Sequence, residues 1–115
     1  MPSAVLIGKP NIGRRCWIGY FCVIDGSGGL EIGDDCSIAS GAHVYTHEMH
    51  MPGTNGVIRR APVAIGRGVY IGANAVVLCG LSIGDGATIG AGAVVTHDVP
   101  AGETWVGVPA RAMGK

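Results

Sequence analysis

The amino-acid sequence predicts an all-β protein built as a parallel β-solenoid, in which short strands stack in successive coils of the chain. Three observations lead to this prediction. Aliphatic residues recur at steps of six, glycine commonly follows them, and hydrophobic residues make up 48% of the 115 residues although aromatic ones make up only 5%. A period of six with frequent glycines excludes an α-helix, because its apolar stripe has a period of about 3.6 and glycine destabilises it.

The repeat extends along nearly the whole chain. In many units a smaller residue stands two positions before the aliphatic one, and strand alternation sends both side chains to the same face. The following glycine allows a turn to the next unit. The aliphatic positions are Leu6, Ile12, Ile18, Ile24, Ile32, Ile38, Val44, Ile65, Ile71, Val77, Ile83, Ile89 and Val95. Strands this short are unstable alone, so we expect each to stack on its equivalent in a prism of about six coils.

Two interruptions of the repeat are the places where function can be attached to the scaffold. The segment 25–31, DGSGGLE, adds two residues at one corner. The segment 46–62, THEMHMPGTNGVIRRAP, brings two histidines, a proline-glycine turn and an arginine pair. We predict a single β-helix domain over residues 1–115, with a projecting loop at about 46–62 and a C-terminal coil and tail at about 101–115.

Charge and hydropathy exclude several classes of protein. Eight Lys and Arg balance eight Asp and Glu, and no basic run exceeds a pair, so the electrostatic footprint of a nucleic-acid or anionic-membrane binder is missing. No apolar stretch approaches the roughly 20 residues of a membrane span. The start MPSAVLIGKP lacks the apolar region of a signal peptide. We therefore expect a soluble, cytoplasmic protein.

The four cysteines, Cys16, Cys22, Cys36 and Cys79, show neither a CxxC pair nor the spacing of a zinc ribbon. The first three occupy the small-residue position of the repeat. We predict that the cysteines are reduced and act as small core residues, and that they form neither disulfides nor a metal site.

The run IASGAHVYTH, a histidine-bearing loop and the stretch APVAIGRGVYIGANAVVLCGLSIGDGATIGAGAVVTHDVPAGETWVGVPAR together resemble the hexapeptide-repeat acetyltransferases. The resemblance covers the chain from about Leu6 to Met113. It is strongest to the sugar O-acetyltransferases, the group of galactoside, maltose, nodulation and polysaccharide acetyltransferases. This family implies a left-handed parallel β-helix and a homotrimer with its sites between subunits.

By this resemblance His47 is the general base, which takes the proton of an acceptor hydroxyl as that hydroxyl attacks a thioester. Histidine suits this role because imidazole titrates near neutral pH and can return the proton to the departing thiolate. Asp25 resembles a carboxylate that holds the acceptor or supports the site, and a turn-forming role is the alternative. Glu48 and His50 are further acceptor-binding candidates, with solvent exposure as their alternative. We expect a structural role for His43.

The resemblance implies acetyl-CoA as the acyl donor, bound along the groove between adjacent prisms, and no metal. Backbone N–H groups near Gly72 and Ala73 are expected to hold the oxyanion, beside Tyr70 where many relatives have Trp. The other expected coenzyme contacts are Ala91, Thr96, His97, Trp105, Pro109 and Arg111. An aromatic side chain and an arginine suit an adenine nucleotide tail. Relatives often have Lys at the position of His97, so a phosphate contact there would depend on pH.

Three alternatives remain at this point. The acceptor nucleophile can be the nitrogen of an amino sugar or another small amine. A non-catalytic β-helical assembly module would bind no acyl-CoA. A γ-class carbonic anhydrase needs three histidines at one zinc ion, whereas His97 lies about three coils, roughly 14 Å, from the other histidines. That separation does not fit zinc–nitrogen distances of about 2 Å, and metal analysis of the purified protein would discriminate.

Overall fold

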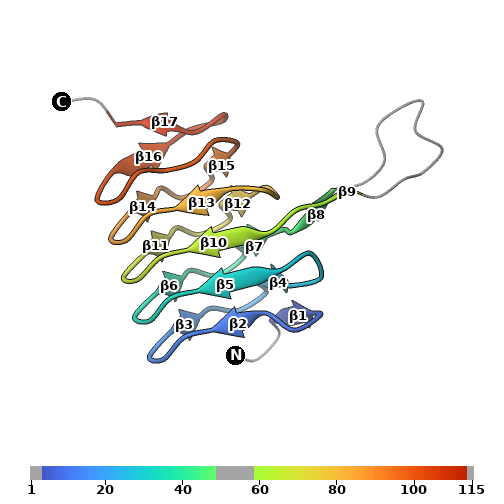
Figure 1. Ribbon diagram of the computed structural model, residues 1–115. Helices are drawn as coiled ribbons and strands as arrows, with labels where there is room; N and C mark the ends of the chain where they lie inside the picture. The colour runs from blue at the N-terminus through green and yellow to red at the C-terminus, as the bar shows by residue number, and fades with distance from the viewer. Residues whose placement is uncertain (1–3, 49–58, 114–115) are drawn as a thin grey trace.

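The computed structural model describes residues 4–48 and 59–113, which fold into a β-helix with three flat faces (Figure 1). These residues form 17 short strands and no helix, so none of their elements is a helix able to cross a membrane. The predicted all-β solenoid is confirmed. Each coil contributes one strand to each face, and that strand pairs in parallel with its equivalent in the next coil.

The three faces, here called A, B and C, follow one another along the chain. Face A contains β1 (Val5–Ile7), β4 (Val23–Asp25), β7 (His43–Val44), β12 (Val76–Val77) and β15 (Val94–Val95). Face B contains β2 (Asn11–Ile12), β5 (Leu30–Ile32), β10 (Val63–Ile65) and β13 (Ser82–Ile83), and a bridge from Ile83 to Val99 extends it. Face C contains β3 (Trp17–Ile18), β6 (Ser37–Ile38), β11 (Tyr70–Ile71), β14 (Thr88–Ile89) and β16 (Thr104–Val106), with β17 (Arg111–Ala112) antiparallel to β16.

The described strands give five coils, one fewer than the number of about six that we expect from the sequence. The reason is the loop, which takes about a coil's length of chain out of the prism. Its two described strands, β8 (His47–Glu48) and β9 (Arg59–Arg60), pair with each other in a separate antiparallel sheet. The sheet projects from the prism as a narrow ribbon (Figure 1).

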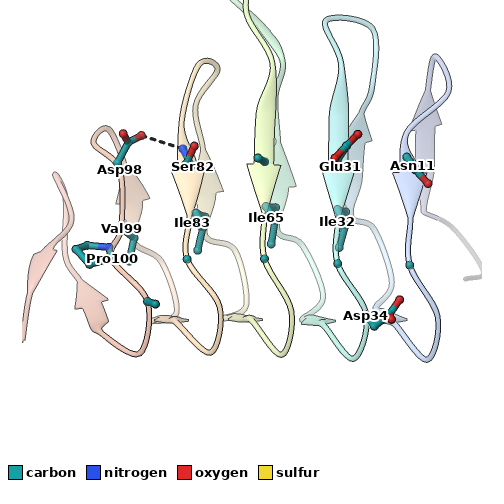
Figure 2. A pocket seen from close by; sticks show the side chains of 16 residues that line it. Asn11, Glu31, Ile32, Asp34, Ile65, Ser82, Ile83, Asp98, Val99 and Pro100 are labelled. Carbon is teal, nitrogen blue, oxygen red and sulfur yellow. Dashed lines mark hydrogen bonds between the residues drawn. The ribbon is translucent and has the colours of Figure 1, made fainter.

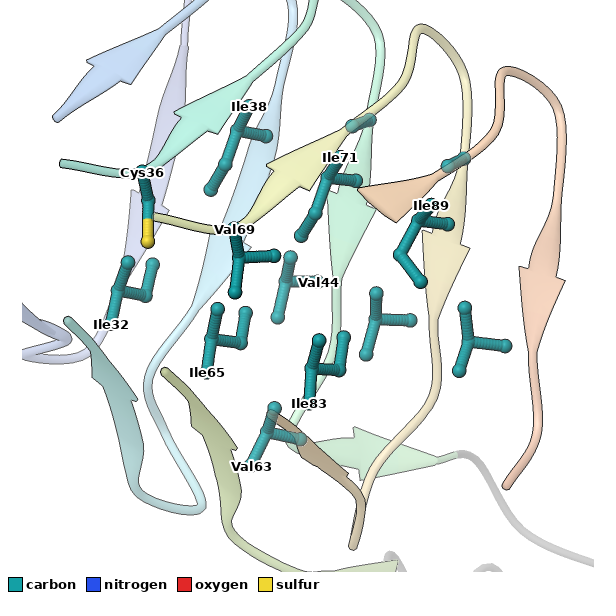
Figure 3. Packing of buried hydrophobic residues seen from close by; sticks show 14 of the residues in the cluster. Ile32, Cys36, Ile38, Val44, Val63, Ile65, Val69, Ile71, Ile83 and Ile89 are labelled. Atoms are coloured by element: carbon teal, nitrogen blue, oxygen red, sulfur yellow. The ribbon is translucent and has the colours of Figure 1, made fainter. Parts of the chain in front are cut away.

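The core consists of aliphatic columns that run along the axis of the helix. On face C, Ile38 pairs in register with Ile71, which pairs with Ile89, and all three are buried (Figure 3). Cys22 and Cys36 are buried in the small-residue position, as predicted. The Cys36 thiol lies 3.0 Å from the Gly66 carbonyl oxygen, and burial raises the pKa of this thiol. Cys22 and Cys36 thus fill the core while their thiols reach backbone acceptors, whereas Cys16 is only half-buried and the buried Cys79 lies beside the Arg59 side chain.

The glycines of the repeat meet two different needs. A Cβ on Gly72 would lie 2.5 Å from the Ala91 nitrogen of the next coil, so close stacking of coils requires glycine there. Gly92 has open space around it but a φ of +71°, which favours glycine for its backbone conformation. The glycine directly after the aliphatic residue therefore serves coil packing, whereas the turn uses a later one.

The outer sides of faces A and B differ in polarity. The outward column of face A is Val5, Val23, His43, Val76 and Val94, joined by the strand registers. The outward column of face B is Asn11, Glu31, Ala64 and Ser82. Figure 2 shows Glu31, Ser82 and Asp98 along a shallow groove of face B, where Asp98 accepts a hydrogen bond of 2.8 Å from the Ser82 N–H. Face A is thus more apolar than face B, and its outward side chains Val23, Val76 and Val94 are half-buried among the residues that the structure describes.

The packing of face C generates a stability prediction. Replacement Ile71→Ala should lower the free energy of unfolding by roughly 2–5 kcal/mol, because it opens a cavity in a fully buried column. The outward replacement Ser82→Ala should stay within about 0.5 kcal/mol, because only the backbone of Ser82 makes the contact to Asp98. Urea denaturation followed by far-UV circular dichroism measures both. Equal effects of the two replacements would contradict the assignment of inward and outward columns.

Candidate functional site

The two interruptions of the repeat meet at one corner of the prism, the turn from face A to face B, here called the A–B corner. Asp25 ends β4 in the second coil, and Thr46 and His47 follow β7 in the third coil. The register that pairs Ile24 with Val44 stacks these two coils directly. Residues more than 20 positions apart in the sequence are therefore brought into contact.

Asp25 is fully buried and is held by hydrogen bonds from all sides. Its carboxylate accepts from the Ser27 N–H at 2.9 Å and the Thr46 N–H at 3.0 Å, and it contacts the His47 Nδ1. The Thr46 hydroxyl, also buried, lies 2.9 Å from the Asp25 carbonyl oxygen and accepts from the Gly28 N–H at 2.8 Å. Burial opposes ionisation of Asp25, but these hydrogen bonds outweigh it and hold the pKa of the carboxyl well below its usual range.

The ionised Asp25 determines which nitrogen of His47 carries the proton. A carboxylate only accepts hydrogen bonds, so the His47 Nδ1 must be the donor in their contact. In the neutral ring the Nε2 then keeps its lone pair. The His47 side chain is 26% exposed, so this basic nitrogen belongs to a ring that solvent can reach. The pair thus presents an oriented, partly exposed imidazole at the surface of the corner, the arrangement that a general base requires.

Two aromatic side chains adjoin His47 on face A. The Tyr45 ring meets the His47 ring edge to face at a centroid distance of 6.1 Å, and it meets the His43 ring in the same way at 5.6 Å. The Tyr45 hydroxyl lies 2.6 Å from the His43 Nδ1. His43 therefore orients Tyr45, which agrees with the structural role expected for it, and the Tyr45 ring lies between the two histidine rings.

The ribbon of β8 and β9 separates His47 from Glu48. Strand alternation sends the two side chains to opposite sides of the ribbon. Glu48 pairs with Arg59 at 3.1 Å, and the same guanidinium reaches the Cys79 sulfur at 3.5 Å. Glu48 therefore lies on the other side of the ribbon from His47, where Arg59 pairs with it. His50, the other acceptor candidate, lies outside the described residues.

The expected oxyanion donors lie at the corner where face C turns into face A, here called the C–A corner. The Gly72 N–H donates to the Ile89 carbonyl oxygen at 2.8 Å, so it is already used in the stacking of coils. The Ala73 N–H has no acceptor among residues 4–48 and 59–113. Ala91 occupies the same corner one coil further on. Of the two predicted donors, Ala73 is the one whose N–H remains available.

The other predicted coenzyme residues gather at the C-terminal end of the prism. His97, Trp105 and Arg111 line one hollow, and the Thr96 hydroxyl lies 3.0 Å from the His97 Nδ1. Pro109 is exposed in the turn between β16 and β17. The sequence-predicted coenzyme residues therefore form two groups, one at the C–A corner and one in this hollow.

Within the described residues of one chain, these groups lie apart from His47. His47 lies at the A–B corner, whereas Ala73 and Ala91 lie at the C–A corner, with the whole of face A between them. In the part of the chain that the structure describes, no three His, Cys, Asp or Glu side chains converge as a metal site would require. The sequence interpretation had assigned no role to Tyr45 and Arg60, and Arg60 is paired directly with His47 across the ribbon. The arginine pair in the loop was the signal for Arg60.

Two family models match the chain. Residues 62–97 match the model described as bacterial transferase hexapeptide (six repeats), and residues 11–46 match the hexapeptide repeat of succinyl-transferase. Both matched segments lie in the coils of the prism, one before the loop and one after it.

Curated relatives are similar over most of the chain. It is 42% identical over 108 residues to nodulation protein L of Rhizobium meliloti (strain 1021). It is 34% identical over 109 residues to galactoside O-acetyltransferase of Escherichia coli (strain K12). Each comparison covers 90% of this chain, but only 58% and 52% of the respective relative. The chain therefore spans little more than half the length of these proteins.

Solved structures share the architecture. A hexapeptide-repeat containing acetyltransferase from Vibrio cholerae superposes with a TM-score of 0.89 at 30% identity, covering 99% of this chain and 68% of that one. A mutant of AntD, an N-acyltransferase from Bacillus cereus in complex with dTDP-4-amino-4,6-dideoxyglucose and coenzyme A, superposes with a TM-score of 0.91 at 27% identity. That match covers 96% of this chain and 66% of the enzyme.

The hydrogen bonds to Asp25 generate a prediction about pH. Replacement Asp25→Asn should lower the free energy of unfolding at pH 7 by about 1–3 kcal/mol, because it removes hydrogen bonds to a charged group. The carboxyl pKa is lower in the folded protein than its ordinary value of about 3.9, so this stabilisation is present above that pH and is lost as pH falls below it. Urea denaturation at pH 7, 4 and 3 should show the difference between the two proteins shrinking toward low pH. A difference independent of pH would contradict an ionised, hydrogen-bonded Asp25.

Proposed function

Because the chain belongs to the hexapeptide-repeat acetyltransferase family, we propose that it transfers an acetyl group from acetyl-CoA to a hydroxyl of a sugar or saccharide acceptor. The observation that carries the proposal is the pair of buried Asp25 and partly exposed His47 at the A–B corner. The galactoside O-acetyltransferase supports the reaction class, and the AntD complex supports coenzyme A as the carrier.

In the proposed reaction the His47 Nε2 accepts the proton of the acceptor hydroxyl while the hydroxyl oxygen attacks the thioester carbonyl carbon. The new carbon–oxygen bond turns the carbonyl oxygen into an oxyanion. When this intermediate collapses, the carbon–sulfur bond breaks and the imidazolium returns its proton to the coenzyme A thiolate. Asp25 acts as a positioning residue, because it fixes the ring and stabilises the imidazolium without touching the reacting atoms.

The position of the oxyanion donor supports a site built from two subunits. The available N–H of Ala73 lies at the C–A corner, and His47 lies at the A–B corner on the other edge of face A. One prism therefore cannot place both at the same thioester, whereas the A–B corner of one subunit and the C–A corner of its neighbour can. We propose a homotrimer in which face A, with its outward valines Val23, Val76 and Val94, packs between subunits.

The hollow at the C-terminal end supports a position for the coenzyme tail. His97, Trp105 and Arg111 combine an aromatic ring with a guanidinium, the two groups that suit an adenine base and a phosphate. We place the nucleotide end of acetyl-CoA there, with its pantetheine arm extending along the coils past Ala91 toward Ala73.

The second candidate function is transfer to the nitrogen of an amino sugar. The N-acyltransferase AntD, whose fold is shared and whose complex contains an amino sugar, favours this candidate. The base of the proposed mechanism serves both acceptors. An ammonium must lose a proton before its nitrogen can attack, whereas a hydroxyl loses its proton as its oxygen attacks. Comparing an amino sugar with its hydroxyl counterpart in a thiol-release assay separates the two.

Replacement His47→Ala should reduce kcat by at least about a hundredfold, because general-base catalysis contributes roughly that factor or more. Acetyl-CoA binding and the mass of the assembled oligomer should remain unchanged, since neither depends on the imidazole in the proposed arrangement. Thiol release measures turnover, titration calorimetry measures binding, and light scattering measures mass. Near-normal turnover in this variant would remove His47 from the mechanism.

Replacement Arg111→Ala should raise the dissociation constant of acetyl-CoA about tenfold, because it removes a charge-assisted hydrogen bond to phosphate. The kcat at saturating acetyl-CoA should stay close to that of the unmodified protein. Titration with 3′-dephospho-CoA tells which phosphate of the coenzyme loses its contact with Arg111. An unchanged dissociation constant would place the coenzyme tail elsewhere.

A further inference from the structure

We propose that the acceptor carries an anionic group, a carboxylate or a phosphate, and that Arg60 binds this group beside His47. This inference rests on the proposed function, because it concerns the acceptor of the same transfer. It starts from the two sides of the ribbon formed by β8 and β9, one of which carries the base.

The register of the ribbon brings the Arg60 and His47 side chains together. The Ala61 N–H donates to the Thr46 carbonyl oxygen at 3.0 Å, so these two residues form a hydrogen-bonded pair of the antiparallel ladder. The next pair, His47 with Arg60, is then a non-hydrogen-bonded pair, the kind in which opposing side chains approach most closely. Because His47 faces Asp25 and Tyr45, the Arg60 side chain leaves the ribbon on that same side.

The neighbouring Arg59 differs from Arg60 because its guanidinium is neutralised by a carboxylate of the ribbon. It lies on the opposite side and pairs with Glu48. Arg60 is exposed and forms no ion pair with any of the residues that the structure describes. Asp25, the carboxylate on its side, is fully buried and is held by Ser27, Thr46 and His47. The positive charge next to the base is therefore available to a ligand.

The phosphates of the coenzyme are not the anions that Arg60 binds in this proposal. In acetyl-CoA the whole pantetheine arm separates the thioester from the nearest phosphate. With the thioester at His47, the coenzyme phosphates are far from Arg60 and near the hollow of Arg111. The remaining partner is the acceptor, whose hydroxyl must be at His47 during transfer. A guanidinium binds a carboxylate or a phosphate through two parallel hydrogen bonds, so it would also orient that hydroxyl.

Tyr45 adds a flat apolar surface on the same side of the base. Its ring stands beside the His47 ring and is fixed by the bond of its hydroxyl to His43. A sugar ring can lay its C–H face against such a surface while its charged substituent reaches Arg60. The three side chains thus fit a sugar acid or a sugar phosphate better than a neutral sugar.

The test uses acceptor pairs that share the hydroxyls at C2, C3 and C4 and differ at C6, where the charged member has a carboxylate or a phosphate ester in place of the free hydroxyl. The pairs are methyl galactoside against methyl galactosiduronate, and glucose against glucose 6-phosphate, and the rates compared are those of transfer to the shared hydroxyls. Initial rates of thiol release from acetyl-CoA should give a kcat/KM about tenfold or more higher for at least one charged member than for its neutral counterpart. The pair that shows the preference distinguishes a carboxylate from a phosphate. Replacement Arg60→Gln should remove the preference by raising KM for the charged acceptor, with kcat little changed, and Arg60→Lys should keep part of it.

Replacement Arg59→Gln is the matched control, because it removes the adjacent charge from the other side of the ribbon and should leave the preference intact. Thermal unfolding verifies that each variant is folded. Transfer to neutral members with equal or greater efficiency, transfer to no member, or a preference that survives Arg60→Gln would overturn the inference. Failure to bind acetyl-CoA in titration calorimetry would instead overturn the proposed function, so the two failures are distinguishable.

Discussion

The structure depends on one constraint, the fixed register in which each six-residue unit stacks on its equivalent in the next coil. Parallel hydrogen bonds between coils and the aliphatic columns of the core enforce this register together, as Ile38, Ile71 and Ile89 show on face C. A slip by one residue would turn every inward side chain outward. The register therefore fixes which residues share a corner, and through the corners it fixes the site.

The A–B corner shows how this rigidity is used. An isolated buried carboxylate is costly, and Asp25 is stable there because Ser27, Thr46 and His47 satisfy it with hydrogen bonds. Those partners come from two interruptions of the repeat that only stacking brings together. The same contacts that stabilise the carboxylate also select the proton-bearing nitrogen of His47. The same hydrogen bonds therefore stabilise the corner and orient the imidazole of His47.

The distribution of groups over the three faces explains why the proposed enzyme needs more than one copy of the chain. His47 is at one edge of face A, and the available Ala73 N–H is at the other. Face A also carries the apolar outward column that includes Val76 and Val94. Packing of this face between subunits would cover the apolar column and would bring the two edges together at each interface. Assembly and completion of the site then have the same physical cause.

The sequence by itself determined the solenoid, because a period of six with a glycine in most units leaves few other ways to bury aliphatic residues. It also pointed to His47, through the resemblance of the histidine-bearing loop to that of the hexapeptide-repeat acetyltransferases. The role of Asp25 stayed undecided between a turn and the site, because its contacts lie 21 and 22 positions away in the next coil. The sequence could likewise not predict that Glu48 and Arg60 lie on opposite sides of the ribbon, because this follows from the pairing of β8 with β9. Repeating local patterns determine the scaffold, whereas stacking between coils and pairing across the ribbon decide which side chains meet.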